Sequence, residues 1–175
     1  MKVRYSYLPQ QFRNTSRLWA KLKKFVKTGD FTLGKPLAEF EKKFANLIGV
    51  KYAVGVNSGT DALKLSLKAL NIGPGDEVIT AANTFVATVG AINELGAKII
   101  FVDCDDTFCM NVDLIEKKIS KKTKAIVPVH FTGCMPKMKK LMKLSKKYKI
   151  PVIEDACQSI LSSYQKKLSG TWGIT

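Results

Sequence analysis

Residues 77–102 read EVITAANTFVATVGAINELGAKIIFV, and this stretch decides the fold. It begins and ends with short apolar runs, EVIT at 77–80 and KIIFV at 98–102, which are β-rich and predict strands. Residues 85–94, between them, predict a helix. Two strands that are joined through a helix run parallel, with a right-handed crossover. The stretch therefore predicts one β-α-β unit of a parallel sheet.

The same alternation continues on both sides of this unit. Further patterns predict strands at 52–56, 124–129 and 151–154, and helices at 36–48, 60–70, 113–119 and 136–148. Gly49 follows the first of these helices as a left-handed cap, and Asp113 with Glu116 predicts a capping box. Residues 1–34 have weaker periodicity and predict an irregular arm with one short helix. The predicted fold class is α/β, an open, mostly parallel sheet with helices on both faces.

The chain is strongly basic. Its 175 residues carry a formal net charge of +15, from 29 Lys and Arg against 14 Asp and Glu. A positive field of this size attracts anions such as phosphates, and nucleic acid is one candidate partner. However, the lysines between 139 and 147 are spread as a solvated helix face and are not gathered beside aromatic residues. The pattern therefore favours solvated lysines over a nucleic-acid interface.

The cysteines and the hydropathy pattern bear on metal binding and location. Four cysteines, at 104, 109, 134 and 157, form no C-x-x-C pair and have no histidines at ligand spacing. This pattern favours reduced thiols over a zinc site or a disulfide framework. The first thirty residues lack a signal-peptide pattern, and no stretch approaches the ~20 apolar residues that a membrane helix needs. We expect a cytoplasmic protein with no metal and no membrane partner.

A candidate phosphate site follows the run at 52–56, since ligands of open parallel sheets gather beyond the carboxyl ends of the strands. Ser58 and Gly59 form a tight turn, and Thr60 and Asp61 begin a helix whose free amides and dipole suit an anion. The alternative is an ordinary capped helix start. The turn matches neither the phosphate loop of nucleotide hydrolases nor the dinucleotide fingerprint, which argues against ATP and NAD.

Three more residues, each after a predicted strand, could contact a flat heterocyclic ligand at the same edge of the sheet. Phe85 begins the helix after 77–80 and offers a stacking face, although a Phe at a helix start usually packs in a core. Asp155 follows 151–154, where a carboxylate can pair with a pyridinium nitrogen; the alternative is a helix cap or strand-end solvation. Gln158 is in a position to hydrogen-bond the phenolic oxygen of such a ring.

A resemblance to the DegT/StrS-type sugar aminotransferases is carried by five segments in the same order: FTLGKPLAEFEKKFA, GVNSGTDALKLSLKAL, GPGDEVITAANTFVAT, IVPVHFTG and VIEDACQS. These enzymes have fold type I and depend on pyridoxal 5'-phosphate (PLP). The resemblance implies that they move an amino group, commonly from glutamate, to a keto group on a nucleotide-linked sugar. It also implies a homodimer with active sites at the subunit interface.

The resemblance also implies roles for single residues. The turn at Ser58 and Gly59, with Thr60 and Asp61, would hold the PLP phosphate. Phe85 would stack on the pyridine ring, Asp155 would pair with the ring nitrogen, and Gln158 would contact the phenolic oxygen. These roles require that the Thr60 helix start and the Asp155 carboxylate converge on one crevice.

The Schiff-base lysine of the family follows a segment that the resemblance places beyond Thr175, and no lysine inside the chain sits in a matching motif. We therefore expect no catalytic residue in this chain and no amino transfer by residues 1–175 alone. The implied domains are an N-terminal arm at 1–34 and an incomplete PLP-binding large domain at 35–175, without the C-terminal small domain.

Two other functions stay open. Some relatives replace the lysine by histidine and remove a sugar hydroxyl, so a PLP-dependent sugar dehydratase is one alternative. A non-catalytic basic protein that binds nucleic acid or regulates expression is the other. His130 is the single histidine, which gives little support for a Ser-His-Asp or two-histidine metal mechanism, and we expect it to be structural.

Overall fold

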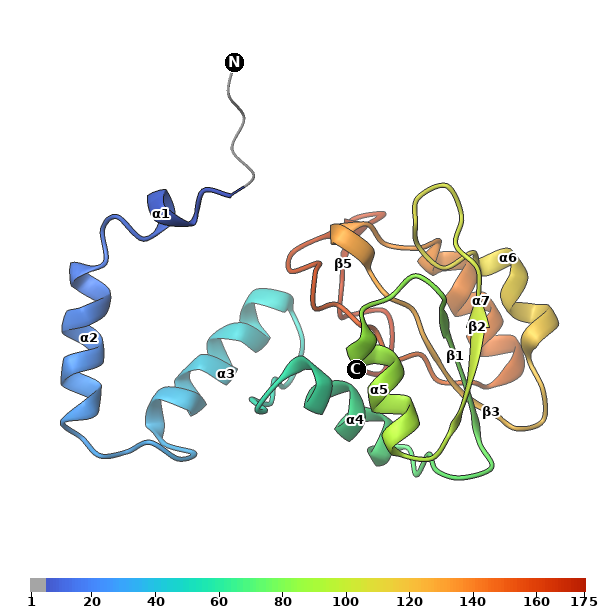
Figure 1. Cartoon of the computed structure of the whole chain (residues 1–175), viewed down its shortest axis with the longest axis horizontal. Coiled ribbons are helices and arrows are strands. Elements are labelled where there is room, and N and C mark those ends of the chain that lie inside the picture. Colours follow the sequence, from blue (N-terminus) through green and yellow to red (C-terminus); the bar gives the residue numbers. More distant parts are fainter. Residues whose placement is uncertain (1–5) are drawn as a thin grey trace, which may run out of the picture.

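The computed structural model describes residues 6–175, and Figure 1 shows a sheet with helices around it and an arm that stands apart. The elements follow one another in the order α1 (Leu8–Gln11), α2 (Ser16–Val26), α3 (Lys35–Ile48), α4 (Gly59–Ala69), β1 (Glu77–Ala81), α5 (Val86–Glu94), β2 (Lys98–Val102), α6 (Val112–Ile115), the 3-10 helix η1 (Glu116–Lys118), β3 (Thr123–Val127), the 3-10 helix η2 (Phe131–Gly133), α7 (Met138–Tyr148), β4 (Ser163–Tyr164) and β5 (Lys167–Leu168).

The central sheet is parallel. β1 lies between β2 and β3, with Val78 opposite Ile99 on one side and Ile79 opposite Ile126 on the other. Two isolated parallel bridges, Ile126 to Val152 and Val129 to Asp155, place the 151–155 segment on the far side of β3. The carboxyl ends of β1, β3 and this segment therefore lie along one edge of the sheet.

The two faces of the sheet are covered by different helices, because successive side chains of a strand point to opposite sides. One buried cluster joins the sheet to α4 and α5 through Leu63, Leu67, Val78, Ala91, Ile92, Ala125, Val127 and Ile153. The other joins it to α6 and α7 through Ile79, Val112, Ile115, Ile126, Met138, Leu141 and Val152. The predicted α/β class, with helices on both faces, is confirmed.

The predicted strand at 52–56 is wrong. Tyr52 and Val54 are 72% and 78% exposed, and within residues 6–175 no strand pairs with this run. Its Gly55 N–H donates to Oε1 of Glu41 instead. A short apolar run becomes a strand only when a neighbouring strand accepts its backbone, and the pattern of the run alone says nothing of that neighbour. The 151–154 run does lie beside β3, but through isolated bridges only.

Helix ends differ from the predictions in two places. Asn111, not Asp113, caps α6: its side chain accepts from the Asp113 N–H at 3.1 Å, and the helix passes into η1 after Ile115. Phe85 is the residue before α5 and not its first turn. The predicted left-handed cap at Gly49 is confirmed, with φ 79° and ψ 31°.

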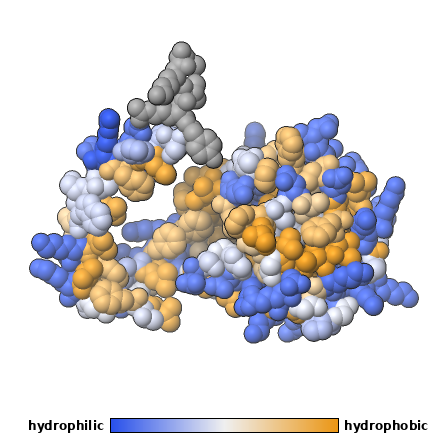
Figure 2. All heavy atoms as spheres, in the orientation of Figure 1, coloured by the Kyte–Doolittle hydropathy of each residue, from blue (hydrophilic) through white to orange (hydrophobic). Residues whose placement is uncertain are grey.

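The arm is more regular than predicted, since α2 alone spans eleven residues. Leu18, Leu22 and Phe25 recur at helical spacing, which is the signal that the expectation of one short helix overlooked. No side chain of α2 is buried, and Figure 2 shows apolar surface on this arm among the hydrophilic residues. Among the helices of residues 6–175, none is long and apolar enough to cross a membrane.

Candidate cofactor-binding site

A cavity of about 210 Å³ lies where the chain leaves the strands, and it gathers residues from separate parts of the sequence. Its lining residues are Gly59, Thr60, Leu63, Phe85, Ala87, Val129, Asp155, Cys157 and Gln158. The α4 start, the residue that caps α5 and the end of the 151–155 segment thus meet at one place. The structure therefore brings Thr60 and Asp155 to one cavity, as the sequence predicted, and Phe85 lies at the same cavity.

The start of α4 presents backbone donors to this cavity. Ser58 caps the helix, and its Oγ accepts from the Asp61 N–H at 3.1 Å. The first amides of a helix have no acceptor within the helix, so those of Gly59 and Thr60 are available to an anion. Ser58 and Asp61 do not line the cavity, and their place is in the turn that shapes it.

Phe85 stands at the cavity with most of its ring uncovered. It caps α5 with an extended backbone, at φ −67° and ψ 145°, and it is 66% exposed. The alternative expectation, that this Phe packs in the core, is therefore wrong. A large aromatic face beside a cavity offers a stacking surface to a flat ligand.

Asp155 supplies the acidic group of the cavity. The residue is buried at 7% exposure, and its Oδ2 accepts from the Thr88 hydroxyl at 2.6 Å. Its Oδ1 receives a long contact, 3.4 Å, from the Cys157 N–H, and the Cys157 thiol also interacts with this carboxylate. The sequence reasoning missed Thr88, although a hydroxyl on the buried face of an otherwise apolar helix was the signal that could have found it.

Gln158 has its side chain held by the backbone of η2. Its Oε1 accepts from the Thr132 N–H at 2.7 Å. Because the amide oxygen is engaged by a backbone donor, the NH₂ end of the side chain is the end left to donate to a ligand. The residue lines the cavity and is exposed.

Cys157 is a cavity residue that the sequence reasoning also missed. The residue is exposed, yet a Cβ on Gly59 would lie 2.9 Å from its Sγ, so the sulfur packs closely against the α4 turn. Desolvation of the sulfur and the adjacent Asp155 carboxylate raise the pKa of this thiol to about 11. Cys157 is therefore a neutral thiol at physiological pH.

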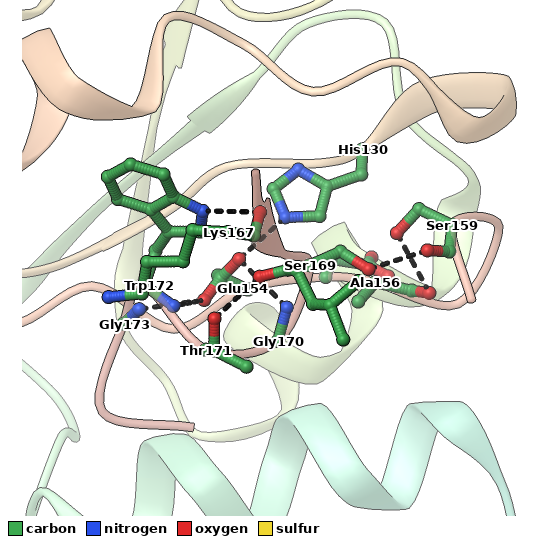
Figure 3. Close-up of polar contacts among 12 residues, drawn as sticks. His130, Glu154, Ala156, Ser159, Lys167, Ser169, Gly170, Thr171, Trp172 and Gly173 are labelled. Atoms are coloured by element: carbon green, nitrogen blue, oxygen red, sulfur yellow. Dashed lines mark hydrogen bonds and ion pairs between the residues drawn. The ribbon is translucent and has the colours of Figure 1, made fainter. Parts of the chain in front are cut away.

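Glu154 has a different set of partners from its neighbour Asp155, and Figure 3 shows it among His130, Gly170, Trp172 and Gly173. Its Oε1 accepts from the backbone N–H groups of Trp172 and Gly173, at 2.6 and 2.7 Å. Its Oε2 accepts from Gly170 N–H at 3.0 Å and lies 2.8 Å from Nε2 of His130. This carboxylate therefore ties the last part of the chain to the sheet.

The electrostatics of this cluster follow from its donors. Desolvation by burial raises the pKa of Glu154, but the hydrogen bonds from His130, Gly173 and Gly170 outweigh it and hold the pKa below its usual value. His130 is fully buried, and within residues 6–175 its Nδ1 has no hydrogen-bond partner. His130 belongs to this cluster and does not line the cavity. In the same residues, no group of three or more His, Cys, Asp or Glu is placed to hold a metal.

The fold and the cavity together define a protein of the α/β class whose cavity, mainly apolar with a few polar groups, lies beyond the carboxyl ends of a parallel sheet. The chain belongs to the DegT/DnrJ/EryC1/StrS aminotransferase family, whose model matches residues 13–175.

Three relatives illustrate the membership. The chain is 40% identical over 161 residues to UDP-2-acetamido-2-deoxy-3-oxo-D-glucuronate aminotransferase of Pseudomonas aeruginosa, covering 91% of this chain and 45% of that protein. It is 43% identical over 140 residues to 3-oxo-glucose-6-phosphate:glutamate aminotransferase of Bacillus subtilis, covering 79% of this chain and 32% of that protein. The structure matches that of NtdA from Bacillus subtilis, which was solved with the cofactor PMP, the amino form of PLP, at a TM-score of 0.89 and 37% sequence identity. The match covers 96% of this chain and 39% of the NtdA chain. The chain spans less than half the length of these relatives.

Proposed function

We propose that this protein binds PLP in the cavity and serves PLP-dependent transfer of an amino group to a keto group on a nucleotide-linked sugar. The observation that carries the proposal is that Asp155 and Thr60, at the start of α4, line one cavity although they lie 95 positions apart in the sequence. The name of the Pseudomonas aeruginosa relative supports the substrate class, and the PMP in the NtdA structure supports the cofactor.

The residue types that line the cavity match the chemical groups of PLP. The Thr60 hydroxyl and the amides of Gly59 and Thr60 would hold the phosphate, and Phe85 would lie against the ring. Asp155 would accept from the protonated ring nitrogen, and the NH₂ of Gln158 would donate to the phenolic oxygen. When bound, PLP supplies a ring that takes up the electrons released as a substrate carbon loses its proton.

We also propose an amino donor, an oligomeric state and a cellular location for this protein. The name of the Bacillus subtilis relative supports glutamate as the amino donor. We propose a homodimer, for which the exposed apolar side chains Leu18, Trp19, Leu22 and Val26 of α2 are the supporting observation. Four free cysteines support a cytoplasmic location, where thiols stay reduced.

The cofactor assignment is tested by titrating the purified protein with PLP and measuring binding by equilibrium dialysis. We expect Asp155→Ala to lose at least about tenfold in affinity, because a charge-assisted hydrogen bond is removed. Asp106→Ala is the matched control, since Asp106 is an exposed acid that does not line the cavity. Equal PLP affinity in Asp155→Ala and Asp106→Ala would show that the cavity is not the site.

The reaction is tested separately, with the complete gene product. We expect it to release 2-oxoglutarate from glutamate over many turnovers when a nucleotide-linked 3-keto sugar is present, and no more than one equivalent per bound cofactor when the sugar is left out. Repeated turnover without the sugar, or none with it, would contradict the proposed substrate class while leaving PLP binding untouched.

A further inference from the structure

We infer that Thr88 is a positioning residue that orients the Asp155 carboxylate toward the ring nitrogen of the bound cofactor. The inference rests on the proposed function, because it assigns a task within the same cavity. Thr88 itself does not line the cavity. Any effect that it has on a ligand there must therefore pass through Asp155.

The contact between the two residues is short and shielded from water. Thr88 Oγ1 donates to Asp155 Oδ2 at 2.6 Å, and the two residues are only 1% and 7% exposed. A hydrogen bond to a carboxylate in such a place is stronger than one at the surface, because no water competes for either atom. Thr88 therefore holds one of the two carboxylate oxygens in a fixed place.

A second hydroxyl sets the direction of this hydrogen bond. Thr84 Oγ1 lies 2.8 Å from Thr88 Oγ1, and a hydroxyl has a single proton. Because the proton of Thr88 is directed at Asp155, Thr84 must be the donor to Thr88. The three groups thus form a directed chain, from Thr84 through Thr88 to the acid.

The engagement of Oδ2 determines what Oδ1 can do. Oδ1 receives the 3.4 Å contact from the Cys157 N–H, and the neutral Cys157 thiol beside the carboxylate is a weak donor, so among the described residues Oδ1 has no strong donor and is the oxygen left to accept one from a ligand. The terminal torsion of an Asp side chain is broad when nothing holds it. Without the Thr88 hydroxyl the carboxylate plane would be free to turn, and a ring N–H would meet a less favourable acceptor geometry.

The position of Thr88 on α5 links it to the stacking residue. Phe85 caps this helix, and Thr88 follows three residues later, within its first turn. One helix start therefore carries both the aromatic face at the cavity and the hydroxyl that orients the acid.

The test compares two ligands on three variants. PLP offers a ring nitrogen, whereas 1-deaza-PLP carries a carbon in its place and gives Asp155 nothing to bind. We expect Thr88→Val to bind PLP about tenfold more weakly than the native protein, and 1-deaza-PLP with the native affinity. Thr88→Ser keeps a hydroxyl and should restore most of the PLP affinity.

Thr107→Val is the matched control, because Thr107 also donates to an aspartate, Asp105, but neither residue lines the cavity. We expect it to bind both ligands as the native protein does. Equal weakening of both ligands in Thr88→Val, or no weakening of PLP, overturns the inference. Failure of the native protein to bind PLP overturns the proposed function as well, so the two failures are distinguishable.

Discussion

The carboxylate of Glu154 lies 2.8 Å from Nε2 of His130, and neither side chain is exposed to solvent. Three backbone N–H groups, from Gly170, Trp172 and Gly173, complete the surroundings of the same carboxylate. An anion enclosed in this way is stable only while its donors stay in place. This cluster, rather than the cavity, fixes the last part of the chain.

Replacing Glu154 by Gln should therefore weaken the fold. We expect the free energy of unfolding at pH 7 to fall by about 2–3 kcal/mol. The hydrogen bonds to a charged acceptor are lost, and the NH₂ group of the glutamine would face backbone N–H groups, which are also donors. The folded state holds the pKa of Glu154 below its usual value. The stabilisation is thus present above the ordinary glutamate pKa, about 4.3, and is lost as the pH falls through the lower folded value.

Urea unfolding curves of both proteins at pH 7 and at several acidic pH values measure this difference. The control is Glu39→Gln, whose carboxylate pairs with Lys43 on an exposed helix face and should matter by less than about 0.5 kcal/mol. A difference between the native protein and Glu154→Gln that stays constant down to the lowest pH would contradict the pKa argument.

Gly173 should not tolerate any side chain. A Cβ at this position would overlap the carbonyl oxygen of Val152, which is backbone of the sheet and cannot move aside. We expect Gly173→Ala to lower the free energy of unfolding by about 1–3 kcal/mol. Gly90→Ala in α5 is the control, because nothing lies within 4 Å of its added Cβ. It should be neutral or up to about 1 kcal/mol more stable, and similar melting temperatures for the two variants would refute the clash.

Cys157 should react slowly with iodoacetamide although it is exposed. With a pKa of about 11, roughly one thiol in a thousand is ionised at pH 8, and only the thiolate attacks. The labelling rate should rise with pH up to that value. Because the Asp155 carboxylate contributes to the raised pKa, Asp155→Asn should speed the labelling. A rate at pH 8 equal to that of an unperturbed cysteine peptide would count against this.

The same thiol reports on the occupied cavity. Cys157 lines the cavity, whereas Cys134 is exposed but does not line it. We expect saturating PLP to protect Cys157 from alkylation and to leave Cys134 as reactive as before. Peptide mass spectrometry after a timed reaction measures both sites in one sample. Equal protection of the two cysteines would place the ligand elsewhere.

The sequence predicted the parts of the fold that depend on local pattern. The apolar runs that became β1, β2 and β3 pair with one another, and their alternating side chains form the two buried clusters. The prediction failed at 52–56, where strand formation depends on a partner that the run does not encode. It also failed at α6, where the Asn111 side chain, and not that of Asp113, caps the helix by accepting from the Asp113 N–H.

The candidate site was partly within reach of sequence reasoning. Phe85 and Asp155 follow apolar runs that lie in the sheet, and the topology of a parallel sheet brings such positions to one edge. Thr60 reaches the same place through the packing of α4 on the sheet, since the run before it is not a strand. Thr88 and Cys157 were not found, because their roles depend on which side chain packs against Asp155 and Gly59. Contacts of that kind are set by tertiary packing, and they produce no periodic pattern in the sequence from which they could be predicted.

The exposed run at 52–56 has a thermodynamic consequence for the turn that it enters. Apart from the Gly55 N–H, no hydrogen bond to another described residue covers its backbone, so water hydrates these peptide groups. Their amide protons should exchange within seconds, while those of β1 persist far longer. A strand that docked along this run would displace the water and stiffen the approach to Ser58. An anion bound at the start of α4 would then raise the affinity of the protein for such a strand. By linkage, the docked strand would raise the affinity for the anion by the same factor.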